Sequence, residues 1–434
     1  MKIMMLSWEY PPKSVGGLAQ HVYDLTTNLA RSGQEIDLIT AGDHQLPSFE
    51  RVNGINVHRV TPYDVSPSHF IPWILQLNIS MLEKAVSLFN KEGYYHIIHV
   101  HDWLVAYAGR ALKHINKIPM IATIHATEYG RNQGLHNQDQ RYIGDVEWWL
   151  AFEAWQVICC SSYMQKELET VYKIPRDKIK IIYNGVSLEN YQTEKSPEAV
   201  RSFRNQFAEP QGKIVFFVGR LVQEKGVQVL LEAVPEITTY YPKTKFVISG
   251  KGPMMEELKN KAVTLGIEDK VIFTGYIDDE TRNLLYASSD VAVFPSLYEP
   301  FGIVALEGMA TETPVVVSDT GGLSEIIDHG RDGFKTPPGS ADYLARDILK
   351  ILTDENTARK LSQRAYQKVK ELYSWEGIAS KTMEVYQEVF DAYRQDPWSR
   401  EALEIHENKL QSVNRYFTRE NDNFNLARQE RGPN

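Results

Sequence analysis

Short runs of apolar residues alternate along the chain with longer segments in which apolar residues recur every three or four positions. The short runs are typical of buried strands and the longer segments of amphipathic helices. In the first half, the predicted helices lie near residues 18–32, 71–90 and 104–114, and the predicted strands are 3–7, 35–40, 55–60, 96–100, 119–125, 156–161 and 179–183. This alternation predicts an α/β fold whose parallel sheet is covered by helices.

The same pattern starts again after a polar segment, residues 189–197, which has the composition of an interdomain linker. The chain becomes helical from residue 341, and Ser374 is a predicted N-cap for a long helix that ends near residue 393. A further helix is expected near 403–417 in a charged tail. The predicted strands of this half are 214–219, 245–249, 270–274, 290–294 and 314–318.

Composition narrows the class of protein. The 434 residues are 43% hydrophobic and carry a formal charge of -9, which argues against a general nucleic-acid binder. The two cysteines, Cys159 and Cys160, are adjacent within an apolar run, so we expect them in a buried strand and in a reducing compartment.

The N-terminus has the pattern of a short strand and lacks the apolar region and cleavage site of a signal peptide. Residues 71–82 are the most apolar segment of the first half but are too few to span a bilayer. We expect a core-facing helix there, with an acceptor-binding or membrane-surface helix as the alternative. The expected location is the cytoplasm, with the inner face of the membrane as a second option.

The stretch 294–310 places two carboxylates, Glu299 and Glu307, around a Pro-Phe-Gly turn that opens a helix. Pro300 suits the first turn of a helix, and Gly302 lets a ligand approach the backbone. Free amides at such a start favour phosphate, whereas the carboxylates favour hydroxyl groups. The combination predicts a sugar nucleotide; the alternative is an ordinary turn residue and a solvated helix residue.

Arg220 and Lys225 occupy a glycine-bounded loop between a strand and a helix, where they can neutralise a diphosphate. The alternative is two solvated cations. The segment 250–253 lacks the complete dinucleotide fingerprint and the P-loop ending, so a dehydrogenase or a P-loop NTPase is disfavoured. Tyr276 and Ile277 follow a strand on the same edge, where their backbone can meet a base.

In the first half, Gly16 and Gly17 form a loop after the first strand, for which tight packing is the alternative explanation to phosphate contact. His101, Asp102 and His125 sit at strand ends and are expected to line a cleft, against an alternative as ordinary loop residues. No ligand set with helical or hairpin spacing accompanies the histidines, so we do not expect a metal site.

Together these residues resemble the retaining glycosyltransferases of family four and the related glycogen and starch synthases, which have the GT-B architecture of two Rossmann-like domains facing across a cleft. The resemblance covers about residues 1–395. Its most specific part is Glu299-Pro-Phe-Gly-Ile-Val-Ala-Leu-Glu307, preceded in the right order by Gly16-Gly17 and Gly219-Arg-Leu-x-x-x-Lys-Gly226. It implies an acceptor-side domain 1–190, a nucleotide-sugar domain 191–373, and a segment 374–434 whose helix returns to the first domain before a polar tail.

The resemblance also implies roles. Arg220 and Lys225 would hold the donor diphosphate, Glu307 the ribose, Glu299 the transferred sugar, and His125 would lie by the anomeric carbon. The implied catalytic residues are Arg220, Lys225, His125 and Glu299. Donor contacts are implied for Gly16, Gly17, Arg220, Lys225, Tyr276, Ile277, Glu299, Phe301, Gly302, Ile303 and Glu307, and acceptor-side contacts for Glu9, His101 and Asp102.

The implied activity is retaining, metal-independent transfer of a hexose from a nucleotide sugar to a sugar or lipid-linked acceptor, in polysaccharide or glycoconjugate biosynthesis. The nucleotide sugar is a co-substrate, and no other cofactor and no nucleic acid is expected; peripheral membrane contact stays an option. UDP-glucose is the favoured donor from family frequency, while GDP-mannose, UDP-galactose and ADP-glucose stay open. The rival functions are a nucleotide-sugar epimerase on the same architecture and a non-catalytic sugar-nucleotide or glycan-binding protein.

Overall fold

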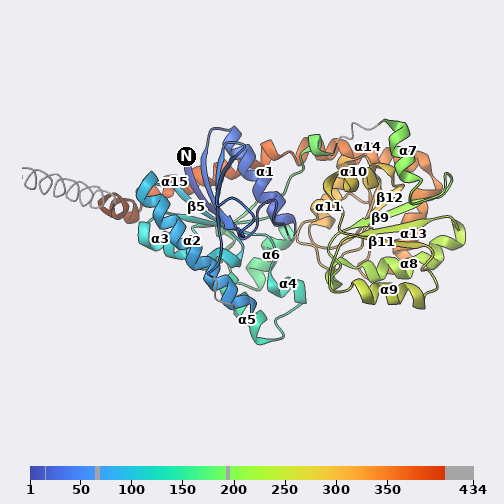
Figure 1. Ribbon diagram of the computed structural model, residues 1–434, viewed down its shortest axis with the longest axis horizontal. Coiled ribbons are helices and arrows are strands. Elements are labelled where there is room, and N and C mark those ends of the chain that lie inside the picture. The colour runs from blue at the N-terminus through green and yellow to red at the C-terminus, as the bar shows by residue number, and fades with distance from the viewer. Residues whose placement is uncertain (15, 64–68, 192–195, 406–434) are drawn as a thin grey trace, which may run out of the picture.

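The computed structural model describes residues 1–405 except 15, 64–68 and 192–195. The strands form two sheets, one in each half of the chain (Figure 1). The first sheet has the order β3-β4-β2-β1-β5-β6-β7-β8 and is parallel except for the β3–β4 pair. Its strands are β1 (Lys2–Leu6), β2 (Glu35–Ala41), β3 (Phe49–Val52), β4 (Ile55–Val60), β5 (Ile97–His101), β6 (Met120–Ile124), β7 (Gln156–Cys159) and β8 (Ile179–Ile181).

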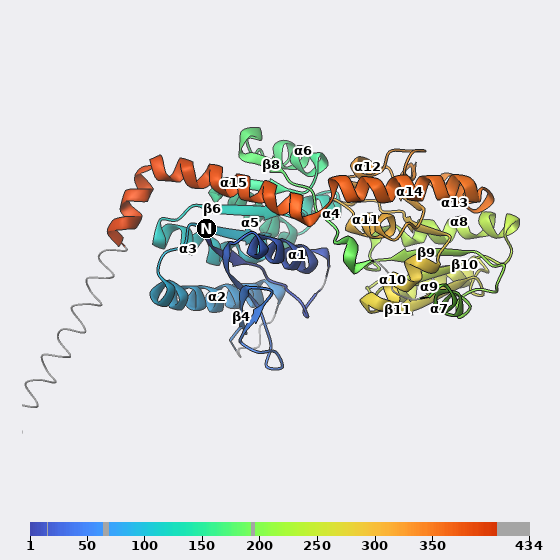
Figure 2. The ribbon, with the colours of Figure 1, turned by 90° about the horizontal axis from the view of Figure 1, so that it is seen from above.

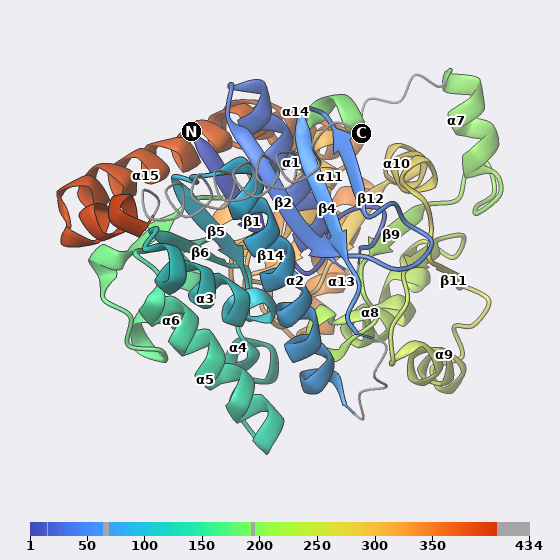
Figure 3. The same ribbon diagram turned by 60° about the vertical axis from the view of Figure 1, so that its left-hand side comes forward.

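Helices cover both faces of this sheet (Figure 3). Successive side chains of a strand point to opposite faces, so Ile3 and Met5 pack with α1 (Gly17–Arg31) while Met4 and Leu6 pack with α2 (Phe70–Glu92). The other helices of this half are α3 (Ala106–Asn116), α4 (Glu128–Asn132), α5 (Gln138–Glu153) and α6 (Ser162–Thr170).

The second sheet is fully parallel, with the order β11-β10-β9-β12-β13-β14. Its strands are β9 (Ile214–Val218), β10 (Lys245–Ser249), β11 (Val271–Gly275), β12 (Val291–Phe294), β13 (Val315–Ser318) and β14 (Phe334–Thr336). Its helices are α7 (Pro197–Arg204), α8 (Val227–Tyr240), α9 (Met255–Thr264), α10 (Asp279–Ser288), α11 (Ile303–Ala310), α12 (Leu323–Ile326), α13 (Ala341–Thr353) and α14 (Glu355–Leu372). The predicted pair of Rossmann-like α/β units is therefore confirmed.

The C-terminal helix returns to the first domain, as expected. Ser374 caps α15 (Trp375–Gln395) by accepting a hydrogen bond from the Gly377 amide, and Figure 2 shows α15 running from the end of α14 across the first domain. Buried residues of α15 share one hydrophobic cluster with α1, which fixes the crossing helix to the first sheet.

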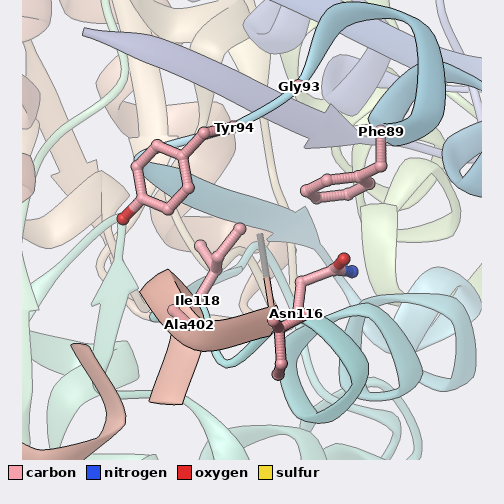
Figure 4. A pocket seen from close by; sticks show the side chains of 7 residues that line it. Phe89, Gly93, Tyr94, Asn116, Ile118 and Ala402 are labelled. Carbon is pink, nitrogen blue, oxygen red and sulfur yellow. The ribbon is translucent and has the colours of Figure 1, made fainter. Parts of the chain in front are cut away.

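The start of the tail packs on the first domain as well. Residues 397–405 are helical, Lys117 pairs with Glu401 at 3.1 Å, and Ala402 lines a small pocket with Phe89 and Ile118 (Figure 4). The helix predicted near 403–417 lies mostly outside the described residues.

Among the described residues, two strands were not predicted from the sequence. β3 is an antiparallel edge strand of half-exposed and exposed residues, so no apolar run marks it. β14 has only three residues, which is too few for a periodic signal.

The apolar segment at 71–82 lies within α2, which buries Ile74, Leu77 and Met81 and exposes Phe70 and Ile79. The core-facing interpretation is thus confirmed for one side of this helix. Among the described residues, no helix combines the length and the apolar character that crossing a bilayer requires.

Candidate active site

Lys225 and Glu299, two of the donor-site residues predicted in the second domain, meet where the strand order of its sheet reverses. β9 lies between β10 and β12, so the loops after β9 and β12 leave in opposite directions, and open α/β sheets bind ligands at such a point. Lys225 Nζ donates to Glu299 Oε2 at 2.5 Å, and the Ser296 hydroxyl donates to the same oxygen at 3.2 Å. Arg220 lies in the same connection after β9 as Lys225, with a side chain 45% exposed and paired with Glu224.

Two glycines allow this close arrangement. Gly226 has φ +70°, and a β-carbon there would lie 1.9 Å from the Pro295 carbonyl oxygen, so only glycine lets the two loops touch. Gly302 has φ +105° at the start of α11, where a β-carbon would meet the Leu323 side chain at 2.4 Å. The Pro-Phe-Gly turn therefore opens a helix, as predicted, and leaves its first amides without a side-chain cap.

Glu307 lies on α11 and is buried. Its carboxylate accepts hydrogen bonds from the Tyr191 hydroxyl at 3.0 Å and from the Tyr286 hydroxyl at 3.2 Å, and Arg282 Nε lies 3.7 Å away. Burial raises the pKa of both tyrosines well above the usual value, so both hydroxyls keep their protons. Glu307 thus already accepts hydrogen bonds from two hydroxyls of the protein, and its predicted contact with ribose stays a prediction.

In the first domain, the strand order reverses between β1 and β5. Gly16 precedes α1, and a β-carbon on Gly17 would lie 3.2 Å from Ile303 Cδ1 of α11. The glycine loop of one domain therefore adjoins the helix start of the other, and Figure 1 shows α11 on the side of the second domain that faces the first.

His125 is held close to the same turn. Its backbone amide donates to Asp102 Oδ1 at 2.7 Å. Cys160 Sγ lies 3.8 Å from the His125 carbonyl oxygen and 3.7 Å from the Pro300 carbonyl oxygen, and the Ser161 hydroxyl donates to Pro300 at 2.6 Å. The end of β7 thus joins the His125 loop to the turn after Glu299, and both cysteines are buried and free, as expected.

Three imidazoles gather beside this loop. His101 Nδ1 lies 3.0 Å from His125 Nε2, and His21 of α1, which the sequence analysis did not select, bonds through Nδ1 to Asn184 Oδ1 at 2.7 Å. Burial lowers the pKa of all three, to about 3 for His125, so the rings are neutral at neutral pH. His125 therefore offers a neutral ring to a ligand, not a positive charge.

The remaining predicted residues range from buried to exposed. Burial raises the pKa of Asp102 to about 6, and its backbone has φ +60°, a region that non-glycine residues rarely adopt. Glu9 is buried after β1. Tyr276 is 73% exposed after β11, with Lys251 over its ring at 5.8 Å, and Ile277 beside it is half-buried.

Glu325 is a contact between the domains that the sequence analysis missed. Its carboxylate accepts hydrogen bonds from the amides of Ser162 at 3.0 Å and Tyr163 at 2.8 Å, at the first turn of α6. A carboxylate is well placed there because free amides and the helix dipole favour negative charge. The pair Gly321-Gly322 after a predicted strand was the available signal, since it repeats the pattern of the first glycine loop.

Glu147 supports the loop that follows His125. Both of its oxygens accept from the Glu128 amide, at 2.9 and 3.1 Å, and Tyr172 donates to it. Burial raises the pKa of Glu147 from 4.5 to about 8, against the opposing charge of Arg131. The folded protein thus holds a proton here at neutral pH that the unfolded chain releases.

Glu147→Gln is therefore expected to change the pH dependence of stability. Between pH 4.5 and about 8, the Glu147 carboxyl of the wild type binds more protons in the folded protein than in the unfolded chain. The free energy of unfolding therefore falls as pH rises through this range, by at most ~1.4 kcal/mol per pH unit. Gln mimics the protonated form and removes this slope. Urea unfolding at about pH 5 and about pH 8 measures it. The exposed Asp139→Asn on the same helix is the control, and equal slopes for wild type and Glu147→Gln would contradict the assignment.

Comparison with known proteins agrees with a chain of two domains. The family model described as "Glycosyltransferase Family 4" matches residues 15–190, and that described as "Glycosyl transferases group 1" matches residues 200–368. An uncharacterized glycosyltransferase of Methanocaldococcus jannaschii is 41% identical over 387 residues, covering 89% of this chain and 98% of that protein.

Two relatives with named activities are similar over most of the chain. A glycogen synthase of Mycobacterium tuberculosis is 32% identical, covering 89% of this chain and 94% of that protein. The structure of a sucrose-phosphate synthase from Thermosynechococcus elongatus has a TM-score of 0.78 at 27% identity, covering 90% and 99% of the two chains. The protein has two facing Rossmann-like domains, and its sequence is 32–41% identical to glycosyltransferases along nearly its whole length. It therefore belongs to the GT-B glycosyltransferases.

Proposed function

We propose that the protein is a retaining, metal-independent hexosyltransferase that moves glucose from UDP-glucose to a sugar or lipid-linked acceptor in polysaccharide or glycoconjugate biosynthesis. One observation carries this proposal: Lys225 pairs with Glu299 close to the uncapped start of α11, and the turn between Glu299 and this helix lies beside the His125 loop. Relatives named glycogen synthase and sucrose-phosphate synthase support nucleotide-sugar chemistry.

In the proposed reaction, the bond between the anomeric carbon and the diphosphate breaks while the acceptor oxygen bonds to that carbon from the same face. The departing phosphate oxygen takes the proton of the acceptor hydroxyl. Negative charge then grows on the diphosphate, where Arg220, Lys225 and the first amides of α11 stabilise it. Preorganised donors of this kind are often the largest contribution to catalysis.

The two glutamates have a different part in this proposal. Lys225 and Ser296 donate hydrogen bonds to the Glu299 carboxylate. In the proposed complex, this carboxylate accepts hydrogen bonds from hydroxyls of the transferred sugar, and Glu307 accepts them from the ribose. A glycoside hydrolase uses one carboxyl as an acid and the second as nucleophile or base. Here the leaving phosphate accepts the proton of the acceptor hydroxyl, so neither glutamate has to act as acid or base.

A thermal-shift panel of UDP-glucose, ADP-glucose, GDP-mannose and UDP-galactose tests the donor. We expect UDP-glucose to give the largest shift, since a ligand at about 100 times its Kd stabilises by ~2.7 kcal/mol. Chromatography of the mixture with glucan or lipid-linked acceptors then tests the reaction, which should release free UDP and form a new glycoside. Conversion to an isomeric nucleotide sugar would instead identify an epimerase, and binding without turnover a binding protein; both outcomes would overturn the proposal.

A further inference from the structure

We propose that His21, His101 and His125 form a three-imidazole site for a divalent transition metal ion of the Zn²⁺ class. The three residues come from α1, from the end of β5 and from the loop after β6, and one ring nitrogen from each lies within 4.8 Å of the others. Three imidazoles that leave one position open are an established ligand set for Zn²⁺. The site is separate from the proposed neutralisation of the diphosphate, which Arg220 and Lys225 perform.

Two of the nitrogens already have nearly the spacing of ligands on one ion. His101 Nδ1 and His125 Nε2 are 3.0 Å apart and share one proton. With Zn–N bonds of about 2.0–2.1 Å in tetrahedral geometry, two ligand nitrogens stand ~3.3 Å apart. Ligation of one ion by both nitrogens therefore needs them to separate by a few tenths of an ångström and both rings to turn toward a common point. The shared proton then moves to the other nitrogen of the ring that carries it, which for His101 is Nε2, a buried atom without a hydrogen-bond partner among the described residues.

The third ligand, His21, has its ring oriented by a hydrogen bond. His21 bonds through Nδ1 to Asn184 Oδ1, which places the proton on Nδ1 and leaves the lone pair on Nε2. His21 Nε2 is buried and has no hydrogen-bond partner within the described part of the chain. A buried polar atom without a partner destabilises the folded protein, and metal ligation would satisfy it. Histidine ligands are usually oriented by a hydrogen bond to the other ring nitrogen, as Asn184 provides here.

The open coordination position is expected next to His125, because that residue is half-buried whereas His21 and His101 are buried. An ion bound there occupies the histidine that the family resemblance puts beside the anomeric carbon of the proposed donor. Zn²⁺ is thus expected to inhibit transfer, a consequence that rests on the proposed function, whereas metal binding itself does not.

The test titrates the chelator-treated full-length protein with Co²⁺, whose visible absorption distinguishes four-coordinate from octahedral ions, and with Zn²⁺ in competition. We expect one four-coordinate ion per chain, displaced by Zn²⁺, and loss of the band in His21→Ala. Asn184→Ala should weaken binding about 10–100-fold, as is typical for a residue that orients a ligand. The exposed His136→Ala is the matched control and should bind like the wild type.

Thermal unfolding of each variant, without metal, shows whether it is folded. If His21→Ala does not fold, Asn184→Ala carries the test, and an unchanged affinity in it overturns the proposal. A wild type without a stoichiometric four-coordinate ion overturns it too, as does a folded His21→Ala that keeps the band. Because these readouts do not use transfer activity, they are independent of whether UDP-glucose is the donor.

Discussion

Lys225→Ala is expected to lower kcat/KM for sugar transfer by about 100- to 1,000-fold, the usual cost of removing one donor that stabilises a developing anion. Lys225 is the cation paired with Glu299 at the point where the second sheet reverses its strand order. Its loss removes positive charge from the proposed diphosphate site and leaves the buried Glu299 carboxylate without its ion-pair partner. Initial rates of UDP release, measured at several donor concentrations, give the effect.

Two further variants separate charge from geometry in this experiment. Lys225→Arg keeps the charge but changes the shape of the donor, so it should recover only part of the lost rate. Lys243→Ala removes an exposed lysine of the same domain, paired with Glu209, and should match the wild type. A folded Lys225→Ala enzyme with wild-type turnover would show that the diphosphate site lies elsewhere.

Glu307→Ala is expected to abolish most donor binding and to reduce transfer by roughly 100-fold or more. Hydrogen bonds to a charged group contribute about 1.5–3 kcal/mol each, and a carboxylate can accept one from each of two ribose hydroxyls. The donor Kd from calorimetry and the rate of UDP release measure the two effects. UDP affinity equal to that of the wild type would contradict the assignment.

The burial of Glu307 calls for a control on folding. Removing the carboxylate leaves the hydroxyls of Tyr191 and Tyr286 and the Arg282 guanidinium without their shared acceptor, so the variant is also expected to be less stable. Tyr191→Phe is the matched variant because it keeps the ring and the carboxylate and removes only a hydroxyl that competes for it. It should retain donor binding, whereas a loss equal to that of Glu307→Ala would assign the effect to packing.

The parts of the site that the sequence predicted share one property. Lys225, Glu299 and Gly17 each lie between a strand and the next α-helix or at the start of that helix, and parallel strands place such connections on one edge of a sheet. Local sequence thus fixes both the residue type and the edge. The same reasoning predicted two α/β domains, because strand and helix periods are properties of short segments.

The parts that it missed depend on distant partners. His21 faces outward or inward according to how α1 packs, and only the fold brings it to His101 and His125. Glu325 acquires its role because the start of α6 lies opposite it, and Glu307 is buried because Tyr191 and Tyr286 converge on it. No spacing along the chain encodes these distances.

The sequence by itself determined the architecture and the donor-side candidates, since periodicity and strand-end positions are set locally. Only the tertiary structure decided how the candidates combine: it paired Lys225 with Glu299, joined the His125 loop to the Pro300 turn through Cys160 and Ser161, and gathered three neutral imidazoles. The physical reason is that ion pairs, burial and shared protons depend on distances between segments, which exist only once the two sheets and the crossing helix α15 are packed.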